Sequence, residues 1–243
     1  RPVLGVGSAV VADSEAEAEW RECLVKGGFA RASSVDTRAP AFDLIETMRF
    51  DPDTGIALLE LHLERIRASA ATLGFAFDRH AVRNQIQALC FALEAPARVR
   101  LLAARSGAIA LEAGAIPAPL PDPAPCIGLP LPVDPGDWRL RHKTSDRGFY
   151  TDALDAAHGA GAVEALLVDC QGRVTEGSFT SVFVERDGTL LTPPAALGLL
   201  PGVLRRSLID SGAAREAALT LAVLEHGFLS GNALRGLIPA RLL

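Results

Sequence analysis

The spacing of hydrophobic residues divides the chain into three segments that predict different elements. In the first, residues 1–32, an apolar strand over Gly5 to Ala12 precedes an acidic helix that begins at Asp13 or Ser14 and runs to Lys26. Either residue can cap the helix, and the acidic residues of its first turn suit its positive end. One strand and one helix bury too little apolar surface, so we expect no independent core in this segment.

The second segment, residues 41–116, predicts a small α+β domain. Apolar residues recur at three- and four-residue steps before Gly74 and again after Asp78, which indicates two helices, the second capped by Asp78. Apolar runs on either side of these helices predict strands. In order, we expect a strand from Phe42 to Phe50, a turn at Asp51–Gly55, the two helices, and a strand pair at Arg98–Ala104 and Ala108–Ala113.

A proline-rich stretch, residues 117–136, separates this domain from a larger one, residues 137–243. Eight prolines between Ile116 and Gly136 are too many for a helix or for the interior of a sheet, so we expect a connector with one short edge strand. A ligand cleft between the two lobes is the natural expectation. In the larger domain we expect strands at Ala165–Asp169 and Thr180–Glu185, and a helix from Pro201–Gly202 to about Gly212.

Composition narrows the class of protein. The 243 residues are 49% hydrophobic, enough for a substantial core, yet no run approaches about 20 consecutive apolar residues, so we expect no membrane span. No basic segment followed by an apolar run marks a signal peptide, which favours the cytoplasm. The net charge of −5 without a long basic run argues against nucleic acid and favours a small-molecule partner. The four cysteines form no CxxC pair, so we expect reduced thiols and no metal site.

Four separated motifs hold candidate chemistry, although each alone is also typical of an ordinary loop or turn. Lys143 lies in a basic stretch after the connector, and Glu176 follows 33 residues later, directly before an apolar strand. Gly202 stands at a helix start, where free backbone N–H groups and the helix dipole favour a phosphate. Residues 228–239 set small and polar residues between apolar flanks, where backbone can approach a ligand closely.

In this order and spacing, the four motifs resemble the class IV aminotransferase family, the fold-type IV pyridoxal-phosphate enzymes, from about Phe42 to Leu243. The resemblance implies a two-lobed α+β or α/β fold like that of D-amino acid aminotransferase, with a small N-terminal and a larger C-terminal domain. It implies pyridoxal 5′-phosphate as cofactor and a homodimer. It places a Schiff base on Lys143, a partner for the pyridine nitrogen at Glu176, and the phosphate at Arg65, Val203, Leu204 and Asn232.

The residue types fit these implied roles. A carboxylate at Glu176 favours a protonated pyridine nitrogen, which the cofactor needs to act as an electron sink. Burial and the nearby cations Arg141 and Arg147 would lower the pKa of Lys143 and supply a neutral amine. Two positions depart from the family. Leu204 replaces a common threonine, and Gly148 replaces a tyrosine five residues after the lysine, for which Tyr150 is a candidate substitute.

The first segment resembles the closing strand and helix of chorismate-utilising synthases. There, magnesium-binding carboxylates would fall at Glu19 and Glu22, with Lys26 one turn on, but so small a remnant supplies only part of a metal site. We therefore expect solvated helix residues at both positions. Bifunctional synthase–lyase chains have the same order, with their junction where Phe29–Pro40 stands here, which makes an aminodeoxychorismate synthase a candidate partner.

The resemblance therefore implies a 4-amino-4-deoxychorismate lyase that releases 4-aminobenzoate and pyruvate in folate biosynthesis, with Lys143 as the base. Its dianionic substrate needs cations, for which Arg100 and Arg147 are the candidates. One alternative is a class IV aminotransferase acting on branched-chain or D-amino acids. Another is an inactive protein that keeps the fold, against which the presence of Lys143, Glu176 and Arg65 argues.

Overall fold

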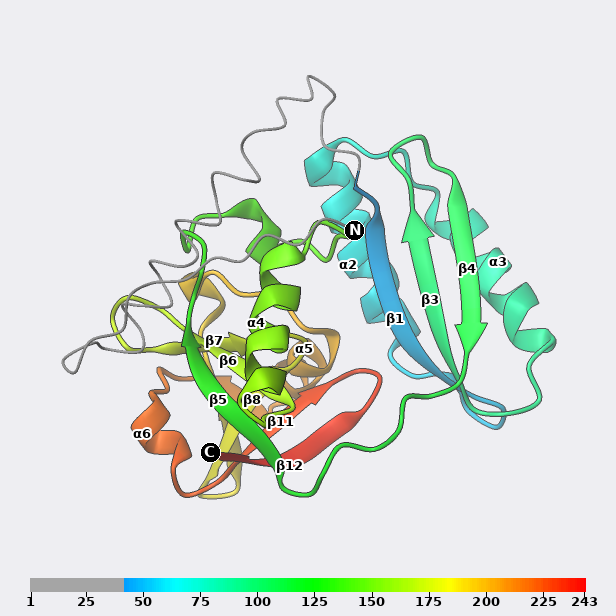
Figure 1. Ribbon diagram of the computed structural model, residues 1–243. Helices are drawn as coiled ribbons and strands as arrows, with labels where there is room; N and C mark the ends of the chain where they lie inside the picture. The colour runs from blue at the N-terminus through cyan, green and yellow to red at the C-terminus, as the bar shows by residue number, and fades with distance from the viewer. Residues whose placement is uncertain (1–41) are drawn as a thin grey trace.

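The computed structural model describes residues 42–243. The strand and helix expected in residues 1–32, together with Glu19 and Glu22, lie outside the described residues. Residues 42–243 form two β-sheets side by side, each packed against helices (Figure 1). These two lobes of mixed α and β elements agree with the expected fold class, while the exact domain boundaries stay predictions.

The smaller sheet is antiparallel throughout, with the strand order β2-β1-β3-β4. Two helices cover one of its faces, behind the strands in Figure 1. The expected order of strand, two helices and strand pair is confirmed. The elements are β1 (Leu44–Asp51), β2 (Gly55–Ile56), α2 (Leu59–Leu73), α3 (Arg79–Phe91), β3 (Ala97–Ala103) and β4 (Ile109–Gly114).

Local sequence explains why these helices begin and end where they do. The side chain of Asp78 accepts hydrogen bonds from the backbone N–H groups of His80 and Ala81 and so caps α3, as expected. Gly74 ends α2 in the left-handed conformation, with φ of 71°, which glycine adopts without steric cost. In β3 the alternation is strict: Val99 and Leu101 are buried in the core with the helices, and the alternate positions, which include Arg98 and Arg100, are half-buried on the opposite face.

The larger sheet is mixed, with the strand order β10-β9-β8-β11-β12-β5-β6-β7. Its core lies around β5, β8 and β12, and a second cluster forms where α4 packs on β5 and β6. Figure 1 shows α4 crossing in front of this sheet. The strands are β5 (Ala124–Pro130), β6 (Glu164–Val168), β7 (Val174–Gly177), β8 (Ser181–Arg186), β9 (Thr189–Thr192), β10 (Ala214–Glu216), β11 (Phe228–Asn232) and β12 (Gly236–Leu242).

The prediction of an edge strand in the proline-rich connector is wrong, because the strand there, β5, lies inside the sheet. It pairs in parallel with both β12 and β6. Its prolines, Pro125 and Pro130, stand close to its two ends, and the carbonyl of Pro125 still accepts a hydrogen bond from the backbone N–H of Val163 at 2.8 Å. Proline removes a donor but not an acceptor, so residues 126–129, which lack proline, can hold the central position.

The helices of the larger lobe are short. The helix expected from Pro201–Gly202 to Gly212 is α5 (Val203–Asp210). The others were not predicted: η1 (Trp138–Leu140), α4 (Gly148–Gly159), η2 (Ala195–Leu197) and α6 (Leu221–Leu224). Among residues 42–243, no helix is both long and apolar enough to cross a bilayer. The three cysteines in this range, Cys90, Cys126 and Cys170, are free thiols.

Candidate active site

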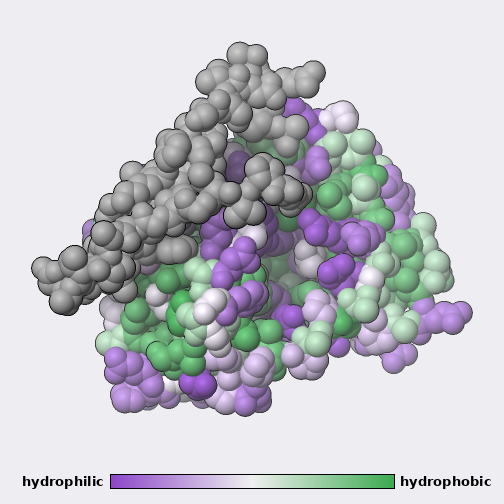
Figure 2. Space-filling view, in the orientation of Figure 1, coloured by the Kyte–Doolittle hydropathy of each residue, from purple (hydrophilic) through white to green (hydrophobic). Residues whose placement is uncertain are grey.

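A cavity of about 340 Å³ lies between the two lobes. Figure 2 shows hydrophilic residues gathered in the middle of the visible face, between more apolar regions on either side. Side chains from both lobes line the cavity, so neither sheet could form it alone. Of the site residues expected from sequence, those that line it are Arg65, Lys143, Arg147, Glu176, Val203, Leu204 and Asn232.

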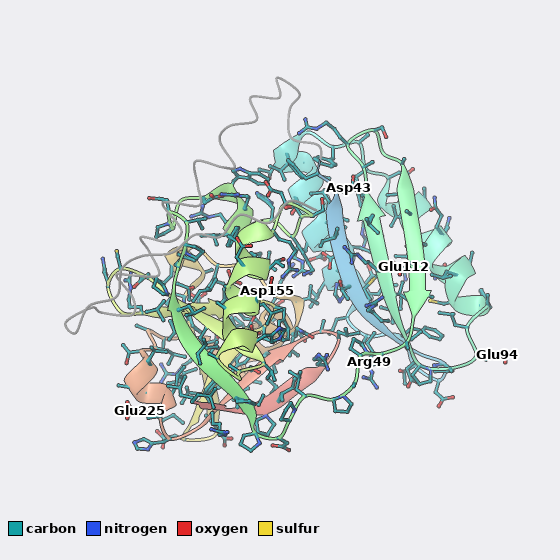
Figure 3. The ribbon with its side chains drawn as sticks, viewed as in Figure 1. Asp43, Arg49, Glu94, Glu112, Asp155 and Glu225 are labelled. Atoms are coloured by element: carbon teal, nitrogen blue, oxygen red, sulfur yellow. The ribbon has the colours of Figure 1, made fainter. Side chains whose placement is uncertain are left out.

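The segment that carries Lys143 is fastened to the smaller lobe by backbone hydrogen bonds. The N–H of Ile45 donates to the carbonyl of Lys143 at 2.9 Å, and the N–H of Ser145 donates to the carbonyl of Asp43, also at 2.9 Å. Thr144 and Leu44 form the antiparallel bridge between these two hydrogen bonds. Asp43 stands just before β1, at the top of the smaller lobe in Figure 3. The position of the lysine is therefore set by β1.

Lys143 has the protonation behaviour of a nucleophile rather than of a surface lysine. Desolvation, followed by the positive charges of Arg147 and Arg65, lowers the pKa of Lys143 from 10.5 to about 7, while Glu46 and Glu176 oppose this shift. A substantial fraction of the side chain is therefore a neutral amine near pH 7. The neutral amine is the form that attacks a carbonyl and later accepts a proton.

Glu176 lies in β7, and its carboxylate is held from two directions. The hydroxyl of Tyr150 donates to Oε1 at 2.6 Å, and the backbone N–H of Leu200 donates to Oε2 at 3.2 Å. Burial raises the pKa of Glu176 to about 7, although both hydrogen bonds and the charge of Lys143 oppose the shift. A carboxylate in this state can share a proton with a basic nitrogen beside it.

Arg65 is the centre of a buried ionic group that sequence reasoning found only in part. Its Nε donates to Oε1 of Glu46 at 2.8 Å, and His62 lies on the other side of that carboxylate, with Nδ1 2.7 Å from Oε2. Desolvation disfavours the charge on Glu46, but Arg65 and His62 outweigh it and hold the pKa of Glu46 at about 2. Glu46 was missed because it stands in an apolar strand.

The N-terminus of α5 completes a cradle for an anion with Arg65. One guanidinium nitrogen of Arg65 donates to the carbonyl of Pro201 at 3.2 Å, which brings the arginine to the start of the helix. Gly202 is the residue before α5, and a Cβ atom there would lie 2.7 Å from the hydroxyl of Ser181. Glycine therefore leaves room beside the free N–H groups of Val203 and Leu204, as an anion site requires.

Asn232 stands at the end of β11, but its side chain is already committed to the backbone. Its Oδ1 accepts from the N–H groups of Leu234 and Arg235 at 3.0 Å, and its Nδ2 donates to the carbonyl of Phe179 at 3.1 Å. The residue thus shapes the turn between β11 and β12 at the cavity wall. Just before it, a Cβ at Gly231 would lie 2.5 Å from the carbonyl oxygen of Gly236, so only glycine fits there.

Arginines from both lobes form one wall of the cavity, and the charge of one of them, Arg147, acts on Lys143. Arg98, which sequence reasoning missed, lines the cavity, while Arg100 does not. Arg100 is nevertheless close enough to Arg147 for its charge to contribute, after burial, to lowering the pKa of Arg147. Arg147 donates to the carbonyl of Ser178 at 2.8 Å. The alternation of arginines along β3 was the available signal, since residues two apart share a face.

The positive charge of Arg98 is partly neutralised by a neighbouring carboxylate. Glu112 of β4 lies 3.7 Å from a guanidinium nitrogen of Arg98 and is mostly exposed, beside β3 in Figure 3. The Nε atoms of Arg98 and Arg100 are buried and have no hydrogen-bond partner among the described residues. Buried donors are normally paired, and of these two residues Arg98 lines the cavity, so its Nε is available to an anionic ligand.

A third buried carboxylate, Glu164, holds a loop that lines the cavity. Its Oε1 accepts from the N–H of Ser178 at 2.8 Å and its Oε2 from the hydroxyl of Thr180 at 2.7 Å. Burial raises the pKa of Glu164 to about 7 in spite of these bonds. Because Ser178 also accepts from Arg147, this carboxylate helps to fix the loop that positions the arginine wall.

Taken together, these residues fit a cofactor with a phosphate, a basic ring nitrogen and a carbonyl. The phosphate would lie at Arg65 and the start of α5, the ring nitrogen at Glu176, and the carbonyl at Lys143. No group of three His, Cys, Asp or Glu side chains suited to a metal ion occurs within residues 42–243.

Comparison with known proteins finds relatives over nearly all of this region. The family model "Amino-transferase class IV" matches residues 43–243. A Schizosaccharomyces pombe protein named "Putative aminodeoxychorismate lyase" is 29% identical over 185 residues, which are 72% of this chain and 76% of that relative. A Mesorhizobium loti structure described as a "Putative amino-acid aminotransferase" has 38% identity and a TM-score of 0.77, covering 83% of this chain and 100% of the other. A structure described as a "Putative 4-amino-4-deoxychorismate lyase" has 28% identity and a TM-score of 0.70, over 82% and 84% of the two chains.

Proposed function

Because the chain belongs to the class IV aminotransferase family, whose enzymes depend on pyridoxal 5′-phosphate, we propose that it is a 4-amino-4-deoxychorismate lyase. The products would be 4-aminobenzoate and pyruvate. The observation that carries this proposal is the arginine wall in the same cavity as Lys143, formed by Arg98 and Arg147 with Arg100 beside Arg147. It suits a substrate with two carboxylates.

The residues of the cradle would hold the cofactor. Arg65 and the N–H groups at the start of α5 would bind its phosphate, and Glu176 would lie against its ring nitrogen. When bound, the cofactor supplies an electron sink for the electron pair released as a C–H bond breaks beside the substrate nitrogen. Glu176 favours this by keeping a proton at the ring nitrogen.

Lys143 would act twice, first by binding the cofactor covalently and then as the base. As the base, its Nζ would take the proton from the ring carbon beside the substrate nitrogen. Its lowered pKa of about 7 makes that amine competent near neutral pH. Cleavage of the C–O bond between the ring and the side chain would then leave an aromatic ring, and the departing enolate would gain a proton to become pyruvate. No amino group is transferred.

The alternative is an aminotransferase acting on amino acids, with the same lysine and cradle. The relation to the Mesorhizobium loti structure favours this reading. A branched-chain substrate presents one carboxylate and an apolar side chain, for which a wall with several arginines is a poor match. The folate pathway, a homodimer, a cytoplasmic location and a synthase partner remain proposals that rest on the resemblance.

The reaction itself is tested by incubating the purified protein with pyridoxal 5′-phosphate and 4-amino-4-deoxychorismate. We expect 4-aminobenzoate and pyruvate to appear in equal amounts, without any added keto acid, because elimination needs no amino acceptor. Both products can be followed by chromatography with a coupled pyruvate assay. If an amino acid and a keto acid instead exchange amino groups while aminodeoxychorismate remains intact, the aminotransferase reading replaces the lyase.

The arginine wall is tested by the substitution Arg98→Leu. A charge-assisted hydrogen bond contributes about 1.5–3 kcal/mol, so we expect KM for aminodeoxychorismate to rise by about 10- to 100-fold, with cofactor binding unchanged. Steady-state kinetics measure the effect. Arg67→Leu is the matched control, since Arg67 is exposed on α2 and does not line the cavity. Equal KM values in both variants would show that Arg98 does not contact the substrate.

A further inference from the structure

Tyr150 is a buried hydroxyl that the proposed chemistry has not used. It lies in the first turn of α4 and is the one tyrosine in the sequence. The family tyrosine five residues after the lysine is absent here, because Gly148 occupies that position. Tyr150 lines the cavity, but its hydroxyl is directed to Glu176 at 2.6 Å.

We propose that Tyr150 is a positioning residue that orients the carboxylate of Glu176 and holds it in the charged form opposite the cofactor's ring nitrogen. The inference rests on the proposed role of Glu176. Tyr150 would therefore not contact the cofactor directly, because its hydroxyl donates its hydrogen bond to the carboxylate of Glu176.

The tyrosine ring is fixed by its own neighbours. Its centroid lies 4.1 Å from that of Phe149, and the guanidinium carbon of Arg147 lies 5.4 Å from the same centroid. Both neighbours come from the same turn, so the hydroxyl points in a direction set by the start of α4. A buried and immobilised donor contributes more to a carboxylate than a mobile one does, because little rotamer entropy remains to be lost.

The two donors to Glu176 come from different elements. Tyr150 reaches Oε1 from α4, and the N–H of Leu200 reaches Oε2 from the loop before α5. Lys143 and Arg147 are the cations whose charges also favour the ionised form, against the cost of burial. Burial raises the pKa of the Tyr150 hydroxyl, the charges of Glu176 and Asp137 raise it further, and the charge of Arg147 opposes the shift. Of these contacts, the Tyr150 hydroxyl can be removed without changing any charge.

Removing that hydroxyl has a definite chemical consequence. A carboxylate that loses a donor becomes a stronger base, so the proton shared with the ring nitrogen moves toward Glu176. The ring nitrogen is then less often protonated, and the cofactor is a weaker electron sink. Substrate binding, which depends on the arginine wall, is unaffected.

The experiment compares the cofactor-loaded wild-type protein with Tyr150→Phe, which keeps the ring contacts. Pyridoxal 5′-phosphate labelled with ¹⁵N in the ring gives an NMR signal that reports protonation of the nitrogen directly. We expect the wild-type signal at the protonated position and the variant signal moved toward the unprotonated one. The value of kcat should fall about tenfold, as for loss of one hydrogen bond to a charged group, with KM within about twofold.

Thr175→Val is the matched control, because it removes another buried hydroxyl from β7. Thr175 Oγ1 donates to the backbone carbonyl of Leu167 at 3.0 Å and not to the carboxylate of Glu176. Its ¹⁵N signal should equal that of the wild type. A wild-type signal in Tyr150→Phe, or the same displacement in both variants, would overturn the inference. An unprotonated nitrogen in all three proteins would instead overturn the proposed role of Glu176, and the inference with it.

Discussion

Lys143→Ala is expected to abolish turnover and covalent attachment of the cofactor. General-base catalysis alone contributes about 10²- to 10⁴-fold, and this lysine also forms the covalent link, so we expect activity to fall by at least about 10³-fold. Cofactor absorbance measured after dialysis, together with the rate of 4-aminobenzoate release, checks both effects. Activity retained within tenfold would contradict the role given to Lys143.

The sequence makes this test unusually clean, because Lys26 and Lys143 are its two lysines. Reduction of the loaded protein with borohydride should therefore attach the cofactor to the peptide containing Lys143, as read by mass spectrometry. Lys26→Ala is the control and should leave both the label and the rate unchanged. A label on Lys26 would contradict the role given to Lys143.

Glu46→Gln is expected to lower the free energy of unfolding by about 3–5 kcal/mol, because it leaves the buried guanidinium of Arg65 without its counter-charge. Urea unfolding of the cofactor-loaded protein measures the loss. Glu60→Gln is the control: Glu60 pairs with Arg79 and Arg83 at the surface, where an ion pair contributes at most about 1 kcal/mol. Similar losses in the two variants would mean that the buried group is not a special source of stability.

The same variant should change the response to acid. The pKa of Glu46 in the folded protein, about 2, lies below its ordinary value of 4.5. Its contribution is therefore complete above about pH 4.5 and is lost as the pH falls toward 2, an amount of about 3 kcal/mol. The wild type should lose stability relative to Glu46→Gln across this range. Parallel stability curves for the two proteins would contradict the ionised pair.

Local patterns predicted the smaller lobe well because its elements carry clear signals of their own. Apolar spacing, the Asp78 cap and the terminal Gly74 define its helices, and a short turn joins β3 to β4. By contrast, α4 went unpredicted. Its buried stripe includes the small residues Ala153 and Ala157 and follows a glycine, so the hydrophobic signal of the helix is weak.

The position of β5 could not be predicted because it depends on pairing with distant strands. Residues 126–130 align with 164–168, and residues 124–126 align with 240–242 near the C-terminus. Local proline content suggested an edge, whereas register with these two partners decides the outcome.

In the candidate site, too, residues with a local sequence signal were predicted and residues that depend on distant neighbours were not. Lys143, Glu176, Arg65 and the start of α5 were identified because they stand in motifs, and the structure brings them to one cavity. The supporting residues Glu46, His62 and Glu164 were missed, since a single carboxylate or imidazole in an apolar segment has no distinctive spacing. Their role depends on neighbours that only the folded chain supplies.

The short backbone bridge between Lys143 and β1 also affects how the substrate's binding energy is used. The hydrogen bonds from Ile45 and Ser145 join a loop of the larger lobe to the first strand of the smaller one, so a hinge rotation between the lobes would break them. The amine of Lys143 and the guanidinium of Arg65 are thus held in fixed relative positions before a ligand binds. Binding energy is then not needed to close the two lobes, and it can serve to orient the reacting bond.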